Sequence, residues 1–78
     1  MASKPYNGHK NWNHWNVALW IGNDEGLYQL AKEALSACDT KREAAEYFME
    51  ALQEYRLDHT PDGAKFTKTT VLAALRGL

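Results

Sequence analysis

The sequence contains a single cysteine, two prolines and no long hydrophobic run. Because Cys38 is alone, no internal disulfide framework can form. No segment approaches the roughly 20 consecutive apolar residues that a membrane-spanning helix requires, and no apolar N-terminal run resembles a signal peptide. We therefore expect a protein without a membrane partner, located in the cytoplasm of the host cell that makes it.

Positive charge is not in excess either. The formal net charge is −1, with nine basic residues against ten acidic ones, so non-specific nucleic-acid binding through a basic surface is not expected. The charges are unevenly distributed, because residues 24–54 contain eight acidic side chains and only three basic ones. The middle of the chain is therefore acidic, whereas both ends are mildly basic.

Sequence motifs of catalysis and metal binding are also missing. There is no nucleophile elbow, no glycine-rich phosphate loop and no zinc-protease motif. The histidines His9, His14 and His59 lack the spacing of metal ligands. The segment 58–63 echoes the start of a calcium-binding loop, but Thr69 stands where that loop requires a bidentate glutamate. We therefore predict a capped turn at 58–63, no metal, no cofactor and no enzymatic activity.

Helical periodicity, by contrast, is present along most of the chain. Apolar residues recur at spacings of three and four in four segments, which are separated by short turns. The predicted fold is all-α, a compact single-domain bundle of about four short helices within residues 1–78, with residues 1–10 as a tail or turn. Consecutive helices should pack as antiparallel neighbours because their connections are short. The four predicted helices cover residues 12–21, 23–37, 40–57 and 68–77.

Local signals predict where these helices begin and end. Gly22 is the predicted stop of the first helix. The side chain of Glu43 should complete a capping box at the start of the third helix, in which two side chains each satisfy a backbone N–H. The predicted N-terminal caps of the last three helices are Asn23, Thr40 and either Thr67 or Thr69.

The first predicted helix is rich in tryptophan. Its apolar residues occupy several sides, with Trp12, Trp15 and Leu19 on one face, Trp20 beside it, and Val17 and Ile21 opposite. A helix that is apolar nearly all round is usually central, so most of these rings are predicted to lie in the core, with one partly exposed at its edge. A β-strand is the competing interpretation, because Trp, Val and Ile favour strands.

The third predicted helix places apolar and acidic residues on opposite sides. Its predicted buried face consists of Ala44, Phe48, Ala51, Leu52 and Tyr55. The other side carries four acidic residues within about 80° of arc, here called the glutamate ridge: Glu43, Glu46, Glu50 and Glu54. Such a ridge is most often a solvated face. The functional hypothesis is a phosphate-like surface that engages a basic channel of another protein.

The first third of the chain has a specific arrangement of aromatic and amide residues, YNG-x2-NW-x2-WNV-x-LWI-x-NDE, which begins at Tyr6. It resembles a family of short, uncharacterised proteins that bacteriophages, plasmids and related mobile elements carry. The resemblance implies a genomic setting and no particular activity. In that setting, small proteins without catalytic motifs often act by stoichiometric binding to a host protein.

We therefore predict a mobile-element protein that binds and inhibits a host defence complex, of the anti-CRISPR or anti-restriction type. Its target would be a nuclease or a CRISPR surveillance complex. The candidate partner-binding residues are Glu43, Glu46, Glu50, Glu54, Tyr6, Trp12, Trp15 and Trp20.

Two alternatives remain open. The first is a small DNA-binding regulator of helix-turn-helix type, since Lys65, Lys68 and Arg76 lie in or near the last helix. Its basic residues are few, however, and the longest helix is acidic. The second alternative is a self-associating structural protein, such as a homodimer that uses the tryptophan-rich helix.

Overall fold

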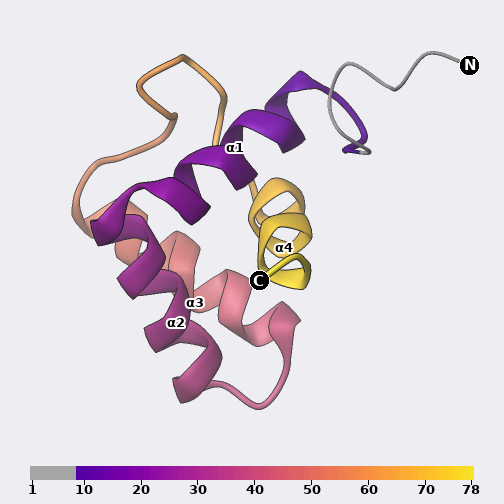
Figure 1. Ribbon diagram of the computed structural model, residues 1–78. Helices are drawn as coiled ribbons and strands as arrows, with labels where there is room; N and C mark the ends of the chain where they lie inside the picture. Colours follow the sequence, from indigo (N-terminus) through magenta and orange to yellow (C-terminus); the bar gives the residue numbers. More distant parts are fainter. Residues whose placement is uncertain (1–8) are drawn as a thin grey trace, which may run out of the picture.

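The computed structural model describes residues 9–78, which form four helices and no strand beyond one isolated bridge (Figure 1). The helices are α1 (Trp12–Asn23), α2 (Glu25–Ala37), α3 (Lys41–Glu54) and α4 (Lys68–Arg76). The predicted all-α bundle of four helices is thus confirmed, and the competing strand interpretation of α1 is wrong. No helix of this part of the chain has the length and apolar content needed to cross a bilayer.

Each helix begins at a side chain that caps a free backbone N–H. The predicted caps Thr40 and Thr67 are confirmed, since their hydroxyls accept from the N–H groups of Glu43 and Thr70, both at 3.1 Å. The Thr40 capping box is only half formed. The Glu43 carboxylate accepts from the Thr40 hydroxyl at 3.4 Å but makes no bond to the backbone N–H of Thr40. The complete box is at Thr67, where the Thr70 hydroxyl accepts from the Thr67 N–H at 2.9 Å.

The boundary between α1 and α2 differs from the prediction. α1 continues through Gly22 to Asn23, and Asp24 is both the last cap of α1 and the first cap of α2. The Asp24 carboxylate accepts from the N–H of Leu27 at 2.9 Å, which makes it the N-cap that Asn23 was expected to be. With only one residue between them, α1 and α2 meet at a corner and do not run antiparallel (Figure 1).

The predicted third helix ends three residues early, because the chain turns in a Schellman motif after Glu54. Arg56 has a positive φ of 58°, its N–H donates to the Gln53 carbonyl at 3.0 Å, and the N–H of Leu57 donates to the Leu52 carbonyl at 2.9 Å. Tyr55 was predicted to be buried, which is wrong. It caps the end of α3, and 71% of it is exposed.

The core contains aliphatic residues and two phenylalanines, but no fully buried tryptophan. α1 turns its Val17 and Ile21 side inward, where it packs against α2 and α4, so the prediction that most of the tryptophan rings lie in the core is wrong. The aromatic rings of the core are those of Phe48 and Phe66, with centroids 6.5 Å apart, in place of the expected indole rings. The fully buried large side chains are Val17, Ile21, Phe48, Leu52, Val71 and Leu75, together with the polar Asn16 and Thr60.

Candidate binding groove

The loop between α3 and α4, residues 55–67, is fastened to α1 by buried polar side chains. The Thr60 hydroxyl donates to Oδ1 of Asn16 at 2.6 Å and accepts from the N–H of Ala64 at 3.0 Å. The amide group of Asn16 donates in turn to Oδ2 of Asp62 at 2.9 Å. Asn16 is 1% exposed and Thr60 is completely buried, so each satisfies the polar atoms of the other. We call this arrangement the Asn16 clasp.

The indole of Trp20 extends the clasp to the surface. Its Nε1 donates to the same Asp62 oxygen that accepts from Asn16, at 2.9 Å. The hydrogen bonds from Asn16 and Trp20 hold the pKa of Asp62 below its ordinary value, because both stabilise the ionised carboxylate. Trp20 is partly buried at the edge of the core, and this bond satisfies its indole N–H.

Within the loop, the backbone forms the capped turn that the sequence predicted at 58–63. The Thr60 N–H donates to the carbonyl of Ala64 at 2.7 Å, and Gly63, with a φ of +100°, donates to the carbonyl of Thr60 at 2.8 Å. Residues His59 and Lys65 pair across this turn in an isolated bridge. Within residues 9–78, no group of three or more His, Cys, Asp or Glu side chains is arranged to hold a metal ion.

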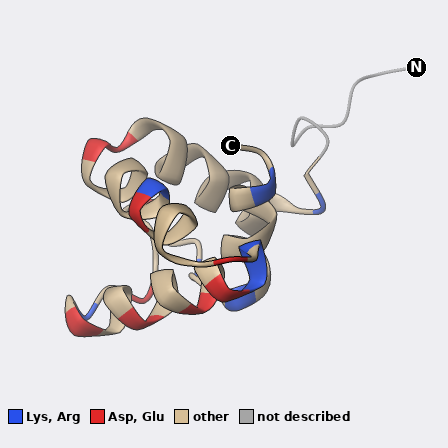
Figure 2. Ribbon diagram, turned by 90° about the horizontal axis from the view of Figure 1, so that it is seen from below, with Lys and Arg blue, Asp and Glu red and all other residues tan. Residues whose placement is uncertain are grey.

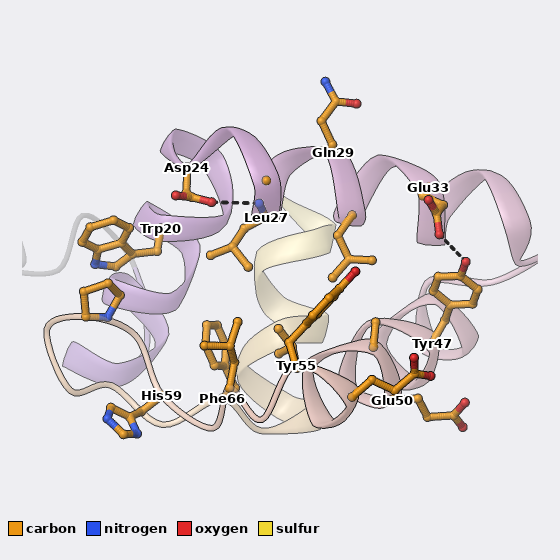
Figure 3. A pocket seen from close by; sticks show the side chains of 17 residues that line it. Trp20, Asp24, Leu27, Gln29, Glu33, Tyr47, Glu50, Tyr55, His59 and Phe66 are labelled. Carbon is orange, nitrogen blue, oxygen red and sulfur yellow. Dashed lines mark hydrogen bonds between the residues drawn. The ribbon is translucent and has the colours of Figure 1, made fainter.

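On its other side the loop closes one end of a groove between α2 and α3 (Figure 3). The groove has a volume of about 710 Å³, within the usual range of ligand pockets. Trp20 and His59 lie at one end, and Tyr47 and Glu33 lie at the other. The apolar and aromatic lining residues are Trp20, Leu27, Leu30, Tyr47, Ala51, Leu52, Tyr55, Leu57, Pro61 and Phe66. We call it the α2–α3 groove.

Among residues 9–78, the groove is lined by four acidic side chains and by no Lys or Arg. The acidic residues are Asp24, Glu33, Glu50 and Glu54. Within residues 9–78, neither Glu50 nor Glu54 forms a salt bridge. Acidic residues recur along α3 and at the corner between α1 and α2 (Figure 2). The groove therefore has an apolar interior and an uncompensated acidic edge.

One hydrogen bond joins the two helical walls. The Tyr47 hydroxyl on α3 donates to a carboxylate oxygen of Glu33 on α2 (Figure 3). This bond is the main cause of a raised pKa of Tyr47, because a phenol that donates to a carboxylate resists ionisation. The bond limits the groove at the end distant from the loop.

The structure divides the predicted glutamate ridge into two parts. All four ridge residues are exposed, but only Glu50 and Glu54 line the groove. Glu46 forms an ion pair with Lys68 of α4 at 2.5 Å, and this bond holds the pKa of Glu46 below its ordinary value. Glu43 takes part in the cap of α3. The ridge is therefore not one uniform surface.

The aromatic residues predicted to bind a partner also do not form one surface. Trp20 lines the α2–α3 groove. Trp15 lies half-buried beside a small hollow on α1 that Leu19 also lines, and Trp12 is 37% exposed. Tyr6 lies outside the described residues. The sequence pattern did not predict the positions of Tyr55 and Leu57 in the groove, or of Asn16 in the clasp.

The fold and the groove define a small all-α protein with an apolar groove and an acidic edge. The chain belongs to a family of unknown function (DUF7249), which matches residues 2–75. This agrees with the resemblance to an uncharacterised family. No curated protein and no solved structure matches the chain.

Proposed function

We propose that this protein acts by stoichiometric binding to a partner protein, and that the α2–α3 groove is its contact surface. The observation that carries the proposal is the combination of an apolar interior with carboxylates that are accompanied by no Lys or Arg among the described residues lining the groove. Apolar pockets with a few polar groups at the edge are the usual form of a binding site. Charge complementarity then selects a partner with a basic surface.

Proteins that handle nucleic acids are the class in which such basic surfaces are most common, because they neutralise phosphates. Combined with the resemblance to proteins of bacteriophages and plasmids, this supports a host defence nuclease or CRISPR surveillance complex as the target. Occupation of a basic surface by this protein would exclude nucleic acid from it. The protein would then work as an inhibitor in the cytoplasm of the host cell.

The test is a plating assay in bacterial strains that carry an active CRISPR or restriction system. Expression of the protein should raise the plating efficiency of a targeted phage toward that on a strain without the system. Affinity purification of the tagged protein from the same strain should recover one nuclease or surveillance complex in stoichiometric amount. Unchanged plating in all the strains, or recovery of DNA in place of protein, would contradict the proposal and favour a DNA-binding regulator.

A matched pair of variants tests whether the groove is the contact surface. Glu50→Lys/Glu54→Lys reverses two charges that line the groove. Glu25→Lys/Asp39→Lys reverses two exposed charges outside it and changes the net charge by the same amount. The groove variant should lose both protection and complex recovery, whereas the control variant should keep them. Equal loss in both would show that only the overall charge matters.

A further inference from the structure

The mouth of the α2–α3 groove contains large apolar side chains that the other residues of the described range 9–78 leave exposed. Tyr55 is 71% exposed and Leu57 is 44% exposed, and both line the groove. The side chain of Tyr55 projects from the end of α3 toward α2 (Figure 3). Leu27, Leu30 and Phe66 continue this apolar surface inward. Exposed tyrosines beside an apolar pocket are the residue type that most often dominates binding energy at protein interfaces.

The edge of the groove determines which apolar ligand fits it. A purely apolar partner would remove water from carboxylates without replacing it, and an unpaired charge that loses its water is strongly unfavourable. A partner that brings its own cations would instead form ion pairs as it excludes water. Glu50 and Glu54 have no salt-bridge partner within residues 9–78, so they are available for such pairs.

The positions of the acidic residues also suggest a spacing for those cations. Asp24 is at the loop end of the groove, and Glu33 is at the opposite end (Figure 3). They are nine residues apart on one helix, which corresponds to about 13 Å along its axis. Asp24 has one oxygen committed to its helix cap, and Glu33 has one committed to Tyr47, so each carboxylate keeps its other oxygen for a ligand.

We propose that the α2–α3 groove binds a short segment of the partner protein that has an apolar anchor flanked on both sides by Lys or Arg. The anchor occupies the surface between Leu30, Tyr55 and Phe66. One cation pairs with Asp24 at the loop end, and the other pairs with Glu33 and Glu50 toward the opposite end (Figure 3). The two cations are about 13 Å apart, which is about nine residues in a helix or four in an extended segment. This inference rests on the proposed function, because it names the ligand of the same surface.

The test uses a displayed library of random peptides of about 12 residues, long enough for the helical spacing, selected on the full-length protein. Selected peptides should contain one or more large apolar residues between two basic ones. Enrichment of acidic or uncharged peptides, or no enrichment above a column without protein, would overturn the inference.

A selected peptide, labelled for fluorescence polarisation, then locates the contact. Tyr55→Ala should weaken its affinity by about tenfold or more, as expected for a central interface aromatic. Tyr28→Ala is the matched control, since Tyr28 of α2 is also an exposed tyrosine but does not line the groove. It should leave affinity unchanged. Equal effects of the two substitutions would contradict binding in the groove.

Charge reversal tests the cations separately. Glu50→Lys/Glu54→Lys should weaken the same peptide by about tenfold or more, and a peptide with its basic residues changed to Glu should bind this variant better than the wild-type protein. Glu25→Lys/Asp39→Lys, which changes exposed residues outside the groove, should bind the original peptide with the wild-type affinity. The absence of any preference reversal would overturn the role of the flanking cations.

The two proposals can fail independently. Recovery of a defence complex that binds the Glu50→Lys/Glu54→Lys and Tyr55→Ala variants as tightly as the wild type would keep the proposed function and reject this inference. Basic-flanked peptides that bind in the groove without any effect of the protein on phage plating would keep the inference and reject the host-defence target.

Discussion

The α3–α4 loop contacts α1 through the Asn16 clasp on one side and borders the α2–α3 groove on the other. The two regions differ in the pairing of their polar groups. In the Asn16 clasp, the buried polar atoms of Asn16 and Thr60 are paired with each other and with neighbouring groups. In the groove, Glu50 and Glu54 are exposed and have no salt-bridge partner within residues 9–78. The two regions also differ in exposure, since Asn16 and Thr60 are buried while Tyr55 at the mouth of the groove is largely exposed.

The clasp therefore stabilises the fold, whereas the groove is available for binding. A buried and satisfied polar network fixes the position of a loop, because any displacement leaves donors and acceptors unpaired. The exposed side chains at the edge of the groove, such as Glu50, Glu54 and Tyr55, bury little surface within the fold and are free to contact a ligand. Substitutions in the clasp should therefore change stability, and substitutions of these exposed groove residues should change binding.

The largest effect is expected for Asn16→Ala. It leaves the buried Thr60 hydroxyl without its acceptor and removes one of the two donors to Asp62. Loss of one partner of a buried hydrogen bond costs about 1–3 kcal/mol, so the free energy of unfolding should fall by about 2–3 kcal/mol with the added loss of packing. Urea denaturation followed by circular dichroism measures it.

Asn13→Ala is the control for this substitution. Asn13 lies on the same helix and is exposed. Its replacement should change stability by no more than about 0.5 kcal/mol. If both variants lose the same stability, the effect comes from the helix and not from the clasp.

Local signals predicted the beginnings of helices better than their ends. The caps Thr40 and Thr67 act on N–H groups three residues away, so a short stretch of sequence contains all the necessary information. The end of α3 carries no such signal, because Arg56 occupies the left-handed position where glycine or asparagine is usual. The resulting error placed Tyr55 in the core.

The clasp and the groove could not be predicted from local pattern. Asn16 and Asp62 are 46 positions apart, and nothing in either segment indicates that they meet. The groove likewise combines the end of α1, parts of α2 and α3, and the loop. The acidic character of the third helix was visible in the sequence, but only the fold separates Glu50 and Glu54 from Glu46, which pairs with Lys68.

A smaller change, in which the free energy of unfolding increases, is expected at Arg56, which has a positive φ of 58°. This conformation costs a non-glycine residue roughly 1–2 kcal/mol. Substitution by glycine removes that cost, but part of the gain is lost because glycine makes the unfolded chain more flexible. Arg56→Gly should therefore raise the free energy of unfolding by up to about 1 kcal/mol. Gly63→Ala, at a φ of +100°, should lower it by a similar amount. A destabilised Arg56→Gly variant would mean that the arginine side chain makes a stabilising interaction.

The clasp should also respond to pH through Asp62. Its pKa in the folded protein is below the ordinary value because Asn16 and Trp20 donate to the carboxylate. The stabilisation is therefore fully present above the unfolded pKa of about 3.9 and is lost as the pH falls through the folded pKa. Asp62→Ala should be less stable than the wild type near neutral pH, and the difference should shrink in acid. Urea denaturation of both proteins over a pH series measures this, and a difference that stays constant down to about pH 2 would exclude a charge contribution.

The smallest effect on stability is expected for Tyr55→Ala in the groove. The side chain is 71% exposed and lies beyond the last residue of α3, so its removal creates no cavity in the core. The free energy of unfolding should change by no more than about 0.5 kcal/mol, while the affinity for a groove peptide falls. Tyr47→Phe is a second substitution in the same groove, which removes only the bond to Glu33 and keeps the half-buried ring. A loss of stability in Tyr55→Ala comparable to that of Asn16→Ala would mean that the groove supports the fold as the clasp does, and the division between a stabilising region and a binding region would fail.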